Sequence, residues 1–201
     1  KAMDIFHATD PAGGSIKYLE QAYVSFKPPK GKGFQLDFGK FVTSAGAEVT
    51  ETHLNWNYSR GLLYANGPFY HFGARVTAPV HKNLTLGYQL VNGWNNVEDN
   101  NSGKTHGFTA AYTSRLLNVS NNYYAGPEKT NTNAGWRHFN DTVVAIYPNG
   151  RLSGLLNFDY GQENNPGESA SRFYGVMAAV HLQLPRGFAF SPRYEWYKDS
   201  S

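Results

Sequence analysis

The chain reads GKFVTSAGAEVTETHLNWNYSRGLLYANGPFYHFGAR over residues 39–75. The first residues of this stretch complete a segment in which apolar and polar residues alternate, and its last residues begin another such segment. Residues 43–68, which lie between the two, show almost no alternation of period two. A connection of this length inside a compact β-protein is uncommon and is usually a functional loop. The stretch therefore predicts two strands joined by a long loop with a role of its own.

The predicted loop is rich in polar groups that could line a hole, and Trp56 and Tyr58 add rigid packing. We expect residues 44–68 to fold toward the lumen of a membrane β-barrel and to narrow it, with charged side chains presented to solvent there. The side chains expected to form this constriction are Glu48, Glu51, His53 and Arg60.

Alternation of period two recurs along most of the chain and predicts about ten strands, most of them about 9 to 12 residues long. The connections between these strands alternate in length. Short turns are expected at 28–33, 81–83, 114–116, 148–151 and 185–187, and long polar loops at 44–68, 95–104, 127–139 and 163–171. Residues 1–16 are also expected to be loop. Outer-membrane barrels alternate in the same way, with short periplasmic turns and longer extracellular loops.

The length of the predicted strands also favours a membrane protein. Ten residues at a tilt near 40° span roughly 25 Å of the membrane normal, whereas strands of soluble proteins are more often five or six residues long. Alternation alone does not decide, because a soluble sandwich shows it too. We therefore expect an all-β fold, an antiparallel up-and-down transmembrane β-barrel, in one domain over residues 1–201.

The alternation also assigns side chains to the two faces of the sheet, except over residues 140–147. The side chains expected to face lipid include Leu36, Phe38, Phe72, Val76, Leu86, Leu156, Val176 and Val180, and Asn157 is expected to face inward. The ionisable candidates for the pore lining are Asp37, His71, Arg75, Asp159, His181, Arg193 and Glu195. Such charges set the selectivity of a wide pore. The alternative is that they are merely solvated or pair locally and stiffen the wall.

Other function classes find little support in the sequence. The chain has 18 basic and 15 acidic residues without a basic run, which argues against a nucleic-acid partner. It has no Cys, so disulfides and thiolate metal sites are excluded. The seven His residues lack metal-ligand spacing, and no phosphate-binding Gly motif is present. Glu48 and Glu51 have no evident nucleophile or partner for acid–base catalysis. We therefore expect no catalytic site, no metal and no cofactor.

Several short motifs resemble the OmpL-like family of outer-membrane β-barrel porins. They are Gly39–Val42, Asn55–Arg60, Pro68–His71, Val91–Asn96, Tyr123–Glu128 and Arg193–Trp196. The resemblance implies a porin of the bacterial outer membrane, with outer-membrane lipid and small hydrophilic solutes as its partners, and it leaves a homo-oligomer open. A barrel with a structural or interaction role, either a sheath around a partner or an adhesin that displays loops, is the alternative.

The order of turns and loops leads to a further expectation about the whole protein. The first predicted strand runs into a short turn and the last one leaves a short turn, so both ends of the chain would be extracellular, whereas barrels of this type have both ends in the periplasm. We therefore expect the chain to be an internal fragment of a barrel with twelve or more strands.

Overall fold

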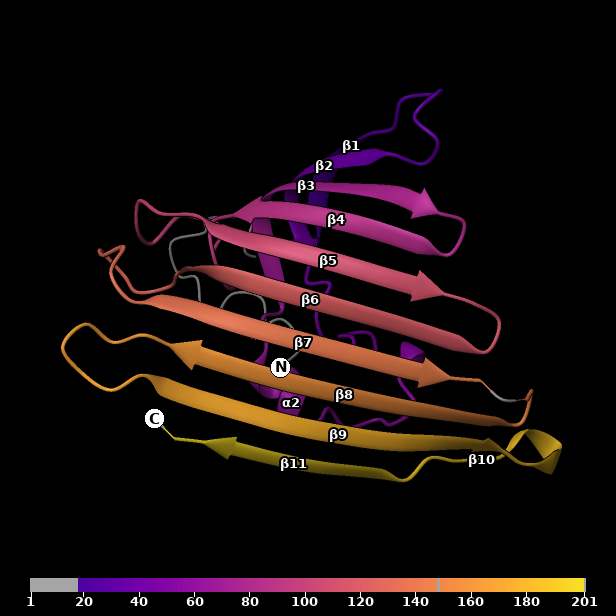
Figure 1. Ribbon diagram of the computed structural model, residues 1–201. Coiled ribbons are helices and arrows are strands. Elements are labelled where there is room, and N and C mark those ends of the chain that lie inside the picture. Colours follow the sequence, from indigo (N-terminus) through magenta and orange to yellow (C-terminus); the bar gives the residue numbers. More distant parts are fainter. Residues whose placement is uncertain (1–17, 148, 201) are drawn as a thin grey trace.

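The computed structural model describes residues 18–147 and 149–200, so the expected loop at 1–16 lies outside the described residues. These residues form one sheet of eleven strands, in which consecutive strands from β1 to β10 are antiparallel neighbours and β11 pairs with β9 (Figure 1). The strands are β1 (Ala22–Phe26), β2 (Gln35–Val42), β3 (Tyr70–His81), β4 (Leu84–Val91), β5 (Thr105–Thr113), β6 (Leu117–Pro127), β7 (Trp136–Ile146), β8 (Leu152–Glu163), β9 (Ser171–Gln183), β10 (Ala189–Phe190) and β11 (Arg193–Asp199).

The all-β, antiparallel up-and-down fold class is confirmed. The sheet has eleven strands instead of about ten because the last expected strand is interrupted at Ser191 and Pro192, and the pieces on either side, β10 and β11, both pair with β9. Proline has no N–H to donate to the ladder, which explains a break at this position. Over the described residues the sheet is not closed, since β1 forms one edge and β10 and β11 form the other.

Connections of two lengths lie at opposite ends of the strands. Figure 1 shows the short turns on the right and the long loops after β4, β6 and β8 on the left. The third long loop is shorter than expected, because β7 begins at Trp136.

The alternation of apolar and polar residues in β7 is hard to read from the sequence, because Val143 and Val144 are adjacent apolar residues. The pairing of β7 with β8 assigns the two faces of β7, since Asp141 lies opposite Asp159 and therefore shares the inward face with it.

The two faces of the sheet follow the predicted pattern. Leu36 and Phe38 are 40% and 61% exposed on the outward face, whereas Asp37 between them is 1% exposed. Asp37 lies opposite Arg75, and Arg75 lies opposite Gln89, so these three side chains share the inward face. A broad apolar surface of this kind is characteristic of contact with lipid. Leu36, Phe38, Asp37 and Arg75 therefore lie on the faces that the alternation assigns to them.

Helices are short in the described part of the chain. They are η2 (Thr52–Leu54), α2 (Leu62–Asn66) and η3 (Pro185–Gly187). None of the described helices is long and apolar enough to cross a membrane. The first two belong to the long connection between β2 and β3, which we call the inner loop (residues 43–69).

Two neighbouring alanines of β5 test the assignment of the faces. Ala110 faces outward and Ala111 inward, each near the middle of the sheet. We expect Ala110→Arg to lower the free energy of unfolding by about 2 to 4 kcal/mol, the cost of an arginine against lipid near the bilayer midplane. Ala111→Arg, the matched control, should cost much less. Equilibrium unfolding in lipid vesicles measures both, and equal losses would contradict the assignment.

Candidate functional site

The inner loop leaves the sheet between β2 and β3 and crosses its inward face as far as β11. Three hydrogen bonds mark this path. The Ser44 hydroxyl lies 2.8 Å from the Tyr124 hydroxyl of β6, and the Ala47 N–H donates to Asn157 Oδ1 of β8 at 3.0 Å. At its far end, Asn57 Nδ2 donates to a backbone carbonyl beside β11 at 2.8 Å. The loop therefore folds onto the inward face of the sheet.

Apolar contacts anchor the inner loop at two places. Ala45 packs with Tyr124 and Phe139, and Leu63 of α2 packs with Met177 and Ala179 of β9. All six of these residues are buried. Because Leu63 alone removes a large apolar side chain from water, its packing contributes on the order of 2 kcal/mol. The loop is thus held to the wall by a small core of its own.

An ion pair fastens the far end of the inner loop to β11. Arg193 Nη1 donates to Glu48 Oε1 at 2.7 Å and to the Ser59 carbonyl at 2.7 Å. The second oxygen of Glu48 accepts the Gly61 N–H at 2.7 Å. The Arg193 and Glu48 side chains are only 14% and 8% exposed. The sequence predicts that Glu48 is presented to solvent, whereas in the structure it is buried against Arg193. We call these contacts the Glu48–Arg193 latch.

Glu195 completes the latch from the same strand. Its Oε1 accepts the Leu62 N–H at 2.9 Å. A Cβ at position 61 would lie 1.7 Å from this oxygen, so any other residue there would displace the Glu195 carboxylate. The hydrogen bond between the Glu195 carboxylate of the wall and the Leu62 N–H of the loop thus depends on Gly61 at the start of α2.

A polar network lies under the inner loop at the middle of the wall. Asp141 accepts hydrogen bonds from Asn122 Nδ2 at 2.8 Å and from Asn157 Nδ2 at 2.7 Å. Asn157 also donates to Asp159 at 2.9 Å, while its own oxygen accepts the Ala47 N–H. All four side chains of the wall are buried. Asn157 therefore connects two carboxylates of the wall to the loop backbone.

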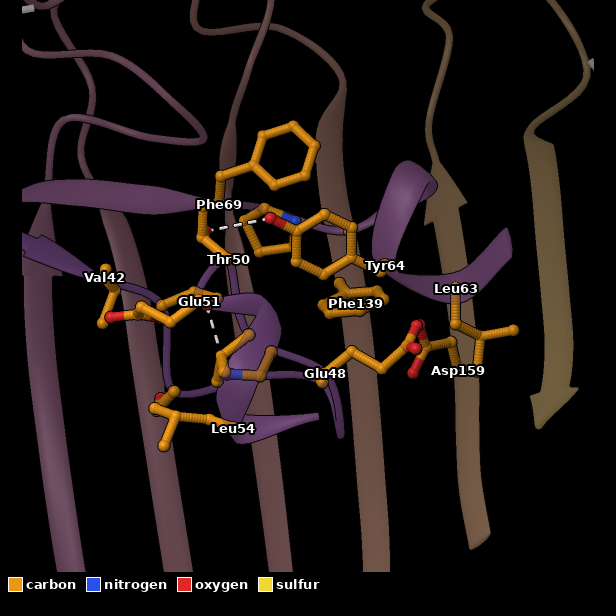
Figure 2. A pocket seen from close by; sticks show the side chains of 17 residues that line it. Val42, Glu48, Thr50, Glu51, Leu54, Leu63, Tyr64, Phe69, Phe139 and Asp159 are labelled. Carbon is orange, nitrogen blue, oxygen red and sulfur yellow. Dashed lines mark hydrogen bonds between the residues drawn. The ribbon is translucent and has the colours of Figure 1, made fainter. Parts of the chain in front are cut away.

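Between the inner loop and the wall is a cavity of about 260 Å³. Figure 2 shows that Glu48, Glu51, Tyr64 and Asp159 line it together with Phe139. Three carboxyl groups thus border one cavity, and no basic side chain of the described chain does so.

Near the other edge of the sheet, and on the same inward face, Asp37 of β2 and Arg75 of β3 form a local ion pair. Arg75 Nη2 lies 2.9 Å from Asp37 Oδ2, and Ser25 and Gln35 both donate to the other oxygen. The Arg75 guanidinium also lies 4.3 Å from the centre of the Phe41 ring. These contacts fix both charges against the wall, which is the local pairing that the sequence leaves open.

The two predicted histidines of the pore lining are engaged as well. His71 is fully buried and stacks on Tyr124 with 4.9 Å between ring centres, and its Nδ1 lies 3.0 Å from the Gly93 carbonyl. His181 stacks on Trp56 of the inner loop at 5.4 Å. His181 therefore packs against the inner loop, and His71 packs beside the start of this loop, so neither ring is fully solvated.

The remaining residues expected in the constriction differ in their roles. His53 is exposed in η2. Arg60 donates to the Thr50 carbonyl at 2.6 Å and to Thr52 at 3.1 Å, so it braces the loop internally. Glu51 lines the cavity. Of the four, only Glu48 joins the loop to the wall.

Sequence reasoning missed the part that Asn122 and Asp141 play. Both have inward parity, but the face of β7 becomes readable only from its pairing with β8. It also missed Glu128, which follows β6 and joins two loops by accepting the Trp94 N–H at 2.9 Å and the Thr105 hydroxyl at 2.7 Å. Burial raises the pKa of Glu128 to about 7, against the opposing effect of these hydrogen bonds and of Arg137. Glu163 raises it further.

No group of three or more histidine and carboxylate side chains is arranged to hold a metal in the part of the chain that the structure describes. The sheet has an apolar outward face and a polar inward face that carries a docked loop, and this combination defines the wall of a transmembrane β-barrel.

Comparison with known families gives one match, to the family described as "Putative beta-barrel porin-2, OmpL-like", which covers residues 2–201. The chain belongs to this family, and the resemblance seen in its motifs is thereby confirmed. No curated protein and no solved structure matches the chain.

Removing Arg193 should release the far end of the inner loop. Arg193→Met leaves the buried Glu48 carboxylate without its cation, which costs about 3 kcal/mol. Hydrogen exchange at Ala47 and Gly61 should then be faster. In a double variant with Glu48→Gln, part of this loss should be recovered, because no unpaired charge remains. Arg172→Met on the outward face is the control. Unchanged exchange in Arg193→Met would contradict the latch.

Glu128→Gln should make the joined loops more stable at high pH. Because the pKa of Glu128 is raised from 4.5 to about 7, its ionisation destabilises the folded loops. The penalty is absent below pH 4.5, grows as the pH rises to about 7, and is then constant at about 3 kcal/mol. Glutamine removes it, so the free energy of local opening at Trp94, measured by hydrogen exchange, should rise above pH 7 and stay unchanged below pH 4.5.

The exposed Glu98, which lies on the same loop as Trp94, offers a control for this pH dependence. Glu98→Gln should leave local opening unchanged at every pH. A gain in stability for Glu128→Gln that is equal at low and high pH would contradict the role of its ionisation.

Proposed function

We propose that the protein forms a water-filled channel of the bacterial outer membrane, through which small hydrophilic solutes diffuse passively, with no catalytic step and no cofactor. The inner loop is the constriction of this channel. Outer-membrane lipid surrounds the wall, and the solutes are the transported partners. Membership of a porin family and the apolar outward face support the location, and the inward face supports the transport.

The observation that carries the proposal is the depth of the inner loop. The Ala47 N–H binds Asn157, which lies six positions from Glu163 at the loop-side end of β8. At about 3.3 Å per residue this is roughly 20 Å along the strand. The loop therefore reaches the middle of the wall instead of covering the mouth, and a loop at this depth narrows the path without closing the entrance.

Charges of both signs lie where the far end of the loop contacts β11. Glu48 and Glu195 lie on either side of Arg193. Fixed charges that border a narrow aqueous path act on every charged solute that passes. We propose that the Glu48–Arg193 ion pair holds the constriction in place, and that Glu51 and Asp159, which line the cavity under the loop, are its acidic groups.

A barrel with a structural or interaction role remains the second candidate. It is favoured by the two apolar clusters that fill part of the inward face. The two candidates differ in conductance, because a filled lumen passes no ions while a constricted one does.

Single-channel recording of the full-length protein in planar bilayers tests the proposal. We expect discrete conductance steps, and a larger unit conductance after deletion of residues 46–60, because the deletion removes the part of the loop that crosses the wall. Folding of the variant is checked by heat-modifiable migration on gels. No steps from the folded wild-type protein would favour the structural barrel, and an unchanged conductance after the deletion would remove the constriction role.

A further inference from the structure

The five short turns of the sheet carry only basic charge. These turns join β1 to β2, β3 to β4, β5 to β6, β7 to β8 and β9 to β10. Their charged residues, which we call the basic turn rim, are Lys27, Lys30, Lys32, Lys82, Arg115, Arg151 and Arg186. No Asp or Glu occurs among the described residues of these turns. Because the turns lie at one end of the strands, the charges gather along one edge of the wall (Figure 1).

The side chains of the basic turn rim are free to bind a partner. All seven residues are exposed. Within the described part of the chain, none of them forms an ion pair. Five turns that are separate in sequence thus present unneutralised positive charge at the same level.

The opposite end of the strands is different in charge. There, acidic and basic side chains are mixed and neutralise one another, as in the Asp99–Lys104 and Arg137–Glu163 pairs. The excess of positive charge is therefore a property of the turn end and not of the whole surface.

Exposed apolar side chains lie directly beside the basic turn rim. Phe26, Val80, Leu116 and Phe188 are 61%, 55%, 49% and 68% exposed at the turn ends of their strands or in the turns. A long basic side chain next to such a surface can lay its methylene stem along apolar groups and place its charge in the headgroup layer. This arrangement fits a lipid surface better than a soluble anion, which offers nothing to the apolar neighbours.

We propose that the basic turn rim binds the phosphate groups of anionic phospholipids in the leaflet that surrounds the turns. Arginine forms paired hydrogen bonds with phosphate, and lysine binds it as a compact charge. Basic residues at the surface of an anionic leaflet attract it within about a Debye length. The interaction requires that the sheet is embedded in a membrane but does not depend on whether the lumen conducts.

Lipid selectivity of the full-length protein tests this interaction. Spin-labelled phosphatidylglycerol and phosphatidylcholine report which lipid is held at the protein surface in reconstituted vesicles. We expect the wild-type protein to prefer phosphatidylglycerol, and Arg115→Gln with Arg151→Gln to lower this preference several-fold, by a factor of up to about 5 for each basic residue. High salt should lower the wild-type preference too.

A matched variant removes two positive charges at the other end of the strands. Lys104→Gln with Lys129→Gln changes the net charge equally, but these side chains are engaged by Asp99 and Asn165 in their loops. We expect this variant to keep the wild-type preference. Equal losses in both double variants would show an effect of net charge alone and would overturn the proposal, as would a wild-type protein without preference.

A soluble acidic partner is the other occupant that the experiment can reveal. Polyglutamate added to the protein in phosphatidylcholine vesicles serves as its probe. If polyglutamate binds through Arg115 and Arg151 while phosphatidylglycerol shows no preference, the basic turn rim recognises an acidic polypeptide and the lipid proposal is wrong. Since neither measurement uses conductance, a failure here is distinct from a failure of the channel.

Discussion

Lipid offers no hydrogen bonds to a polypeptide backbone, and this constraint shapes the whole structure. Each strand inside the sheet pairs with two neighbours, so that its N–H and C=O groups are bonded within the wall. Side chains then alternate between the two faces, and one register decides which of them meet lipid. The inner loop has irregular backbone that cannot be placed against lipid. The inward face is the only side of the wall that can accept it.

A loop docked on a wall must also satisfy its own polar groups. The wall supplies the acceptors, since Asn157 binds the Ala47 N–H and Glu195 binds the Leu62 N–H. Glu48 does the same from within the loop for Gly61 and is itself neutralised by Arg193. The polar character of the inward face therefore has two causes. Part of it suits an aqueous path, and part of it is the complement of one particular loop.

The sequence predicts the faces well because alternation is a local property. Leu36, Asp37 and Phe38 reveal their sides without any knowledge of their partners, and the long loop is visible from its lack of alternation. The contacts that give the charges their roles are not local. Glu48 and Arg193 are 145 positions apart, so nothing near either residue announces their pairing. The face of Asp141 could not be predicted for another reason. Two adjacent valines obscure the alternation of its strand, and only the pairing with the neighbouring strand β8 fixes the register.

The same distinction explains how charge is distributed in the protein. Inside the wall, some opposite charges lie next to each other and hold the loop or the wall in place, as Asp37 does with Arg75, whereas Asp141 and Asp159 are both bound by Asn157. A buried charge needs such a partner, because it loses contact with water and would be costly alone. In the turns, basic side chains remain exposed and have no acidic neighbours. The paired charges of the wall are thus neutralised within the protein, whereas the basic charge of the turns lies where a membrane surface can neutralise it.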